Sequence, residues 1–316
     1  MSHAAGTPVQ LAEDIYGLEM GMPGVPRTSW CYVLLNKDHT VTLIDPGWDI
    51  PENLETILGF FEARGIPLSD LAAIFTTHVH PDHFGWAAEL SRRSGAEIYA
   101  PELEASHFFD KTQSVEFLAN RWQERAVQWG IPGEQLHRLQ GGASEHIPAE
   151  RALIHHYLPE GAPLPGADPS WRLVWTPGHT AGMCCVVNSE RKIIFSTDHI
   201  MSGESPGLGL GGVFVVNPFR LYLDSVKTMS PYEGYLALPG HRQPFTDLVA
   251  QGELSARHHQ RRADEIADAL RNGGENLTLW ELAQRVRWSG GFDSLEGFRL
   301  RSALHHVEIF ADYLLG

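Results

Sequence analysis

A short segment of the chain, residues 76–83, carries an unusual concentration of side chains that bind metals. It reads TTHVHPDH and directly follows an apolar run. Three imidazoles and a carboxylate crowded on one turn would compete for the same few hydrogen-bond partners in a protein core. A divalent metal removes this competition, because imidazole nitrogen and carboxylate oxygen are ligands of zinc and related first-row metals. The segment therefore predicts a metal site, with candidate ligands His78, His80, Asp82 and His83.

Further candidate ligands follow three later apolar runs. One turn cannot close the coordination spheres of two metals, so other segments must supply the remaining donors. The candidates are His179 in TPGHT, Asp198 in FSTDH and His241 in LPGH. Because each of them comes at the end of an apolar run, we expect them to stand at strand ends facing the His-rich turn.

The segments around these residues alternate between apolar runs and a helical pattern. Residues 30–36 and 41–45 read as consecutive buried strands, a helix begins near Pro51, and residues 71–77 return as a strand. The His-rich turn therefore lies at a strand-to-helix crossing, where α/β sheets place ligands. A second round of similar runs occupies residues 171–241. The pattern predicts an α/β protein whose two halves face each other.

These residues resemble the metallo-β-lactamase superfamily over roughly residues 12–245, with every expected ligand position filled in order. The resemblance implies a four-layer αββα sandwich. It also implies that Asp45, in LIDPG, is the buried aspartate that supports the loops behind the site. The implied first metal has ligands His78, His80 and His179, the second has Asp82, His83 and His241, and Asp198 bridges the two. Because no cysteine is among the ligands, the chain resembles the branch that contains glyoxalase II and lactonases rather than penicillin-destroying enzymes.

The chemistry implied by this ligand set is hydrolysis. Two divalent ions about 3.5–4 Å apart lower the pKa of a shared water to near neutrality. Zinc is the first candidate, with manganese, iron or cobalt as alternatives. We predict a binuclear metal-dependent hydrolase whose metal-bridging hydroxide attacks the carbonyl of an ester, lactone or thioester. Asp82 is the expected catalytic residue, which orients the hydroxide and relays its proton. The expected partner is a small-molecule acyl substrate, as for a lactonase or thioesterase.

Two alternatives keep the fold and change the reaction. One is a metal-dependent endoribonuclease or phosphodiesterase, because the tail resembles the helical part of the winged-helix appendage in lactamase-β-like proteins. Its support is a local basic patch at Arg257, Arg261 and Arg262. The other is a mono-iron persulfide dioxygenase, since such members of the family can keep the second-site residues. Glyoxalase II itself lacks support, because no basic glutathione-binding motif follows His241.

The substrate-lining residues carry a weaker signal than the ligands. Met22, Trp48 and Tyr222 are candidates for the wall of a fairly apolar pocket. For Tyr222 the alternative is a packed helix face. The glycine-rich residues 203–212 lack the Lys-Ser/Thr of a phosphate loop and are interpreted as a mobile loop beside Asp198. Five further histidines are predicted to be solvated or packed rather than metal ligands. They are His199, beside Asp198, and His258, His259, His305 and His306 in the C-terminal tail.

The chain divides into a predicted catalytic domain, residues 1–250, and a helical, winged-helix-like appendage, residues 251–316. Inside the first domain, residues 102–170 are less regular and are interpreted as a lid-like insertion. Its Trp122 and Trp129, at helical spacing, fit either an apolar lid or a core. The Thr278-x-x-Glu281 sequence predicts a capping box at a helix start in the appendage.

Composition limits the partners and the location. A formal charge of −15 disfavours nucleic acid and anionic membranes. No apolar run approaches the roughly 20 residues that a membrane helix requires. The three cysteines, two of them adjacent, argue against a disulfide framework and fit a reducing compartment. Since the N-terminus lacks the features of a secretory signal, a cytoplasmic location is expected. The oligomeric state is left open, with a homodimer as one option.

Overall fold

Two β-sheets face each other in this computed structural model, which describes residues 7–23, 27–105, 123–140, 153–211, 214–273 and 276–316. The first sheet has the strand order β1-β2-β3-β4-β5-β6-β7 and is antiparallel up to β4 and parallel beyond it. Its strands are Val9–Ala12, Ile15–Gly21, Thr28–Leu35, Val41–Ile44, Leu71–Phe75, Glu97–Pro101 and His156–Leu158. The second sheet has the order β11-β10-β9-β8, and only its β10 and β11 are parallel. Its strands are β8 Trp171–Trp175, β9 Cys184–Asn188, β10 Ile193–Thr197 and β11 Leu236–Pro239.

The alternation of side chains along the strands divides the core into layers. In β3, Trp30 and Tyr32 point between the two sheets, whereas Cys31 and Val33 point to the outer face. Successive side chains of a strand face opposite sides, so a strand that is apolar throughout must be covered on both faces. The inner layer is completed by side chains from both sheets, among them Phe75, Trp171, Phe195 and Leu238.

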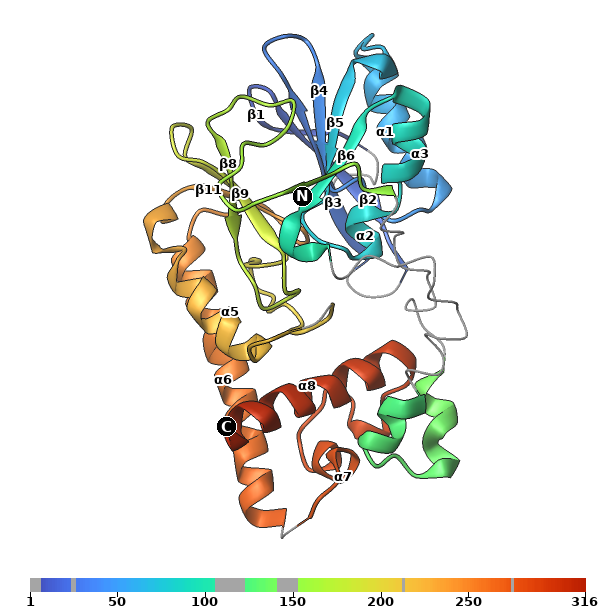
Figure 1. Cartoon of the computed structure of the whole chain (residues 1–316), viewed down its shortest axis with the longest axis vertical. Helices are drawn as coiled ribbons and strands as arrows, with labels where there is room; N and C mark the ends of the chain where they lie inside the picture. The colour runs from blue at the N-terminus through green and yellow to red at the C-terminus, as the bar shows by residue number, and fades with distance from the viewer. Residues whose placement is uncertain (1–6, 24–26, 106–122, 141–152, 212–213, 274–275) are drawn as a thin grey trace.

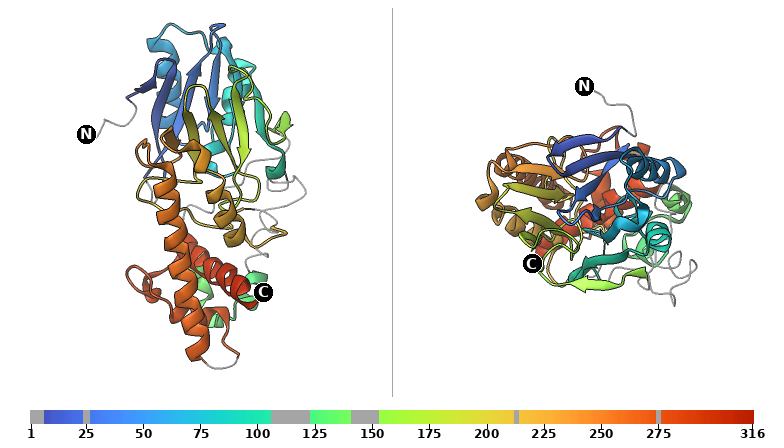
Figure 2. Two further views of the ribbon diagram at one scale, coloured as in Figure 1. Left: turned by 90° about the vertical axis from the view of Figure 1, so that its left-hand side faces the viewer. Right: turned by 90° about the horizontal axis from the view of Figure 1, so that it is seen from above.

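Helices cover both outer faces. On the first sheet, α1 (Pro51–Ala63) buries Ile57 and Phe60, and α3 (Ala87–Ser94) buries Leu90. On the second sheet, Met229 and Leu248 pack on β9 and β10, beside α5 (Pro218–Lys227) and at the start of α6 (Leu248–Gly273). Seen from above, helices flank the two facing sheets (Figure 2). The predicted four-layer αββα sandwich is confirmed.

A helical appendage lies beyond one end of the sheets. It comprises most of α6 together with α7 (Leu279–Gln284) and α8 (Gly297–Leu315), which α6 joins to the sandwich (Figure 2). The predicted capping box is present, since Thr278 Oγ1 accepts from the Glu281 amide and the Glu281 carboxylate accepts from the Thr278 amide. The domain boundary at residue 250 stays a prediction, because α6 runs through it.

Part of the predicted insertion belongs to the core of the appendage. Trp129 is fully buried there beside Trp280 and Phe310, and the Trp280 amide donates to the Trp129 carbonyl over 2.9 Å. Arg138 donates to the carbonyls of Phe292 and Leu295. Trp122 lies outside the described residues, as do residues 106–121 and 141–152. The lid remains a prediction for them.

The short helix α2 (Pro81–Phe84) carries Asp82 and His83. It lies at the end of the first sheet that faces α8 (Figure 1). The loops that follow β5, β8, β10 and β11 hold the candidate ligands from the rest of the chain. Among the described residues, no helix combines the length and apolar character needed to cross a membrane.

Candidate metal centre

The seven predicted ligands converge on two neighbouring groups. In each group one donor atom per residue lies within 4.8 Å of the others. The first group consists of His78, His80, His179 and Asp198, and the second of Asp82, His83 and His241. In the first group, His80 Nδ1 is 3.0 Å from both His78 Nε2 and His179 Nε2. In the second, Asp82 Oδ2 is 3.5 Å from His83 Nε2 and 3.3 Å from His241 Nε2.

Asp198 lies between the two groups. Its Oδ2 is 3.4 Å from His179 Nε2 and 3.4 Å from His241 Nε2, and its Oδ1 is 3.6 Å from His83 Nε2. A single carboxylate thus reaches donors of both groups, which is the position that a bridging ligand requires. Gly240 makes this approach feasible, because a Cβ at that position would lie 2.0 Å from Asp198 Oδ1.

The local sequence fixes the conformation of the His-rich turn. Thr76 Oγ1 donates to the His78 carbonyl over 2.7 Å, which pins the turn directly after β5. Pro81 then fixes the first turn of α2, where its missing N–H costs no hydrogen bond. His78 and His80 therefore project from the segment before the helix and the Asp82–His83 pair from a helical turn. This change of conformation lets four side chains of one segment serve two groups.

The far nitrogen of each ligand ring has a partner that orients the ring. His83 Nδ1 is 2.9 Å from Asp45 Oδ2 and His78 Nδ1 is 3.1 Å from Thr77 Oγ1. Backbone carbonyls serve the other three rings: Gly207 for His179 Nδ1, Leu210 for His80 Nε2 and Thr28 for His241 Nδ1, at 2.7, 2.9 and 2.8 Å. A ring that donates to such an acceptor keeps its proton there, so its other nitrogen is free to bind a metal.

The buried polar atoms of the centre fit a metal cation. His83 Nε2 and Asp198 Oδ1 are buried and have no hydrogen-bond partner among the described residues. Burial, with the neighbouring His83, holds the pKa of His78 well below its usual range, which keeps this ring neutral. Burial alone would raise the pKa of Asp198, but the charges of His241 and His83 hold it well below its usual range. Burial alone would lower the pKa of His83 and of His241, but the charge of Asp198 raises the first well above its usual range and the second to about 10. These two rings therefore carry a proton in the metal-free centre, and a bound metal would replace that positive charge beside the ionised carboxylates.

Asp45 anchors the centre from behind. It is buried, and its carboxylate accepts from the Thr77 amide, from Thr77 Oγ1 and from His83 Nδ1. Its backbone has a φ of 55°, in the left-handed region that aspartate tolerates better than most residues. The same side chain thus fixes both the His-rich turn and one ligand ring.

A second buried carboxylate, Glu104, carried no signal in the sequence. Its Oε1 accepts from Thr180 Oγ1 over 2.6 Å and from the Gly182 amide over 2.8 Å, and its Oε2 accepts from the Val79 amide over 3.0 Å. It therefore clamps the loop of His78 and His80 to the loop of His179. Gly182 permits this contact, since a Cβ there would lie 2.2 Å from the Glu104 nitrogen.

Replacing Glu104 by alanine is expected to lower the free energy of unfolding by about 3 kcal/mol, because three buried donors lose their acceptor at about 1–3 kcal/mol each before relaxation. Denaturant titration of metal-free protein measures this loss. Glu102→Ala, an exposed residue of the same turn, is the control and is expected to change little. Equal unfolding midpoints for E104A and E102A would refute the clamp.

The predicted substrate-lining residues are placed differently from one another. Tyr222 is fully buried, and its hydroxyl is hydrogen-bonded to Ser255 Oγ over 2.6 Å and to the His199 carbonyl over 3.2 Å. It packs beneath the turn of His179, where a Cβ on Gly178 would lie 2.5 Å from Tyr222 Cβ. Its hydroxyl therefore does not line an open pocket. Trp48 is mostly buried and Met22 is partly exposed, and their roles toward substrate stay predictions.

Comparison with known proteins identifies a family and several relatives of this chain. Residues 24–241 match the family model of the metallo-beta-lactamase superfamily. A probable metallo-hydrolase of Bacillus subtilis, YqjP, is 22% identical over 287 residues, which are 87% of this chain and 85% of that protein. The atrochrysone carboxyl ACP thioesterase of Aspergillus fumigatus is 24% identical over 86% of this chain, and the chain spans 52% of its length.

Two solved structures share the architecture over nearly the whole chain. A metallo-beta-lactamase family protein from Thermus thermophilus has a TM-score of 0.75 at 22% identity and covers 97% of this chain and 94% of its own. A beta-lactamase domain protein from Burkholderia ambifaria has a TM-score of 0.73 at 21% identity, with coverages of 100% and 91%. At such identities the likeness concerns the fold, and the coverage includes the helical appendage.

Proposed function

The chain belongs to the metallo-beta-lactamase superfamily, and from that membership we propose that it is a binuclear metal-dependent hydrolase of a carboxylic ester, lactone or thioester. The observation that carries the proposal is the pair of donor groups with Asp198 between them. His78, His80 and His179 would hold one ion, Asp82, His83 and His241 the other, and Asp198 both. When bound, the two ions would supply an activated water as nucleophile and a Lewis acid for the carbonyl.

The chain's own residues perform the remaining tasks. In this proposal, Asp82 holds the proton that the nucleophilic water gives up. Its carboxylate lies beside His83 and His241 at the centre. Burial alone would raise the pKa of Asp82, but the charges of His83 and His241 hold it well below its usual range, so the carboxylate is ionised. The aspartate then returns the proton to the leaving oxygen or sulfur.

Zinc is the ion that we propose for both groups. All donors are imidazole nitrogens and carboxylate oxygens, and no cysteine thiolate takes part, a set that zinc shares with manganese, iron and cobalt. The preference for a small-molecule acyl substrate is supported by the thioesterase relative and by the acidic chain, whose net charge of −15 opposes binding of a polyanion.

The nuclease alternative loses support from the surroundings of the basic patch. Arg257 forms an ion pair with Glu253, and Arg262 forms one with Glu265 while its guanidinium lies 4.4 Å from the centre of the Trp288 ring. Arg262 is therefore largely covered and engaged within the protein, and the exposed Arg257 has an acidic neighbour that offsets its charge toward a phosphate. A mono-iron dioxygenase would use only the first donor group, so this alternative does not account for the second group.

Metal analysis combined with a substrate panel tests the proposal. Purified protein is expected to contain two metal ions per chain and to hydrolyse at least one nitrophenyl ester, lactone or acyl thioester. A chelator should abolish this activity, and added zinc should restore it. One iron per chain with oxygen consumption, or cleavage of single-stranded RNA without acyl hydrolysis, would overturn the proposal.

A further inference from the structure

A four-residue stretch of the glycine-rich loop, residues 207–210, lies against the first donor group. The Gly207 carbonyl accepts from His179 Nδ1 over 2.7 Å, and the Leu210 carbonyl accepts from His80 Nε2 over 2.9 Å. The Leu210 amide donates back to the His179 carbonyl over 2.9 Å. This stretch therefore sets the orientation of two ligand rings.

The other side of the same stretch is held by two adjacent histidines of α8. The Leu208 amide donates to His306 Nε2 over 3.0 Å, and His305 Nε2 donates to the Gly209 carbonyl over 2.7 Å. The two rings thus act in opposite senses, one as acceptor and one as donor. Along the loop, their contacts at Leu208 and Gly209 lie between the carbonyls of Gly207 and Leu210, which serve the metal ligands.

The backbone of the loop is shaped for this close approach. Gly209 has a φ of 67°, and a Cβ there would lie 2.6 Å from Ile309 Cδ1 and 2.9 Å from His305 Nε2. A Cβ on Gly207 would lie 2.4 Å from Leu210 Cδ1. A side chain at Gly209 would be strained by the positive φ and would meet α8, whereas a side chain at Gly207 would displace the Leu210 side chain.

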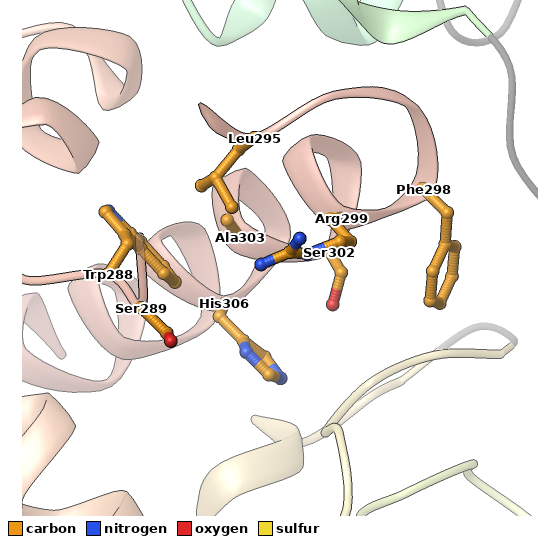
Figure 3. A pocket seen from close by; sticks show the side chains of 8 residues that line it. All are labelled: Trp288, Ser289, Leu295, Phe298, Arg299, Ser302, Ala303 and His306. Carbon is orange, nitrogen blue, oxygen red and sulfur yellow. The ribbon is translucent and has the colours of Figure 1, made fainter. Parts of the chain in front are cut away.

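Both histidines are themselves supported within the appendage. His305 Nδ1 lies 3.2 Å from Glu308 Oε2 and 3.3 Å from Arg125 Nη2, and Arg125 also pairs with Glu308. The His306 ring lies 6.1 Å, centre to centre, from the Phe310 ring, and its other side borders a pocket of about 230 Å³ that Trp288, Arg299 and Ser302 also line (Figure 3). The contacts of His305 and His306 to the loop are thus built on the folded appendage.

We propose that His305 and His306 are positioning residues through which the helical appendage sets the metal affinity of the first donor group. They hold residues 207–210 in place, and the loop carbonyls in turn hold the His80 and His179 rings at the angle that the metal requires. Outer partners of ligand histidines change metal affinity by about 10–100-fold when they are lost. Residues one step further out should have a smaller effect. The inference rests on the proposed metal centre but not on the proposed reaction.

The test replaces each histidine by leucine, which keeps much of the volume and removes the hydrogen bond, and by glutamine, whose amide can donate or accept at a similar distance. Cobalt binding is followed by its visible absorption in competition with a chelator. H305L and H306L are expected to weaken binding of the first cobalt ion by about three- to tenfold, with the second ion affected less. H305Q and H306Q should recover most of the affinity.

His258→Leu is the matched control, since His258 is exposed on α6 of the same appendage. Unfolding of the metal-free variants, followed by circular dichroism, separates loss of fold from loss of positioning. Unchanged cobalt affinity in the two leucine variants would overturn the proposal. So would equal losses in the leucine and glutamine variants, or an equal loss in H258L. None of these outcomes depends on whether the protein hydrolyses an ester, so failure of the proposed reaction remains distinguishable.

Discussion

Asp198→Asn is expected to reduce kcat/KM for the best substrate at least about a thousandfold, which corresponds to about 4 kcal/mol of lost transition-state stabilisation. The aspartate faces histidine donors of both groups, with Oδ2 at 3.4 Å from His179 Nε2 and from His241 Nε2. An asparagine carries no negative charge, and one of its two side-chain atoms is a donor that repels a cation. The substitution therefore weakens both metal sites at once.

A longer carboxylate cannot rescue the site. Asp198→Glu adds a methylene group and so moves the carboxylate away from the position at which Asp198 faces His179, His241 and His83. D198E is therefore expected to be as inactive as D198N although it keeps the charge. Asp224→Asn, on the exposed side of α5, is the control for a neutralised aspartate. Activity of D198N near that of D224N, with two metals still bound, would contradict the bridging role.

The ligand set and the layered fold could be predicted because their signals are local. Four ligands stand within residues 78–83, and the other three follow apolar runs that form strands β8, β10 and β11. The alternation along β3 likewise follows from a period of two. Each of these features depends on neighbours in sequence, where spacing carries information.

The contacts that complete the site are between distant residues and have no such spacing. Glu104 is 76 residues from Thr180, and His305 is 96 residues from Gly209. Nothing in the sequence distinguishes Glu104 from the exposed acidic residues near it, and His305 and His306 were expected to be solvated or packed. They do pack, but against the loop that orients the ligands. The partner of the Tyr222 hydroxyl is likewise distant in sequence, since it is Ser255, 33 residues away.

Asp45→Asn is expected to weaken the second metal site and leave the first unchanged. The Asp45 carboxylate accepts three hydrogen bonds, two from Thr77 and one from His83 Nδ1. The asparagine side chain can accept a hydrogen bond only on its oxygen. Its NH₂ group, a donor, must therefore face either the Thr77 backbone N–H or the N–H of His83 Nδ1. Thr77 Oγ1 can rotate to accept, but a backbone amide cannot, so the amide nitrogen is expected to face His83.

The histidine then changes tautomer. With a donor opposite Nδ1, His83 lowers its energy by moving its proton to Nε2, the nitrogen that lies 3.5 Å from Asp82 and 3.6 Å from Asp198. A protonated Nε2 cannot bind a metal, whereas none of the first group's rings is hydrogen-bonded to Asp45. Metal titration should therefore show D45N with one tight ion, a second site weakened by about 10–100-fold, and hydrolysis reduced in parallel.

Asp45→Ala separates the effect of the tautomer from the effect of packing. It is expected to lower the free energy of unfolding of the metal-free protein by about 2–4 kcal/mol, because three buried donors lose their acceptor. Because D45N keeps both the left-handed backbone and most of the hydrogen bonds, equal metal affinities at the two sites of D45N would show that Asp45 supports the fold alone.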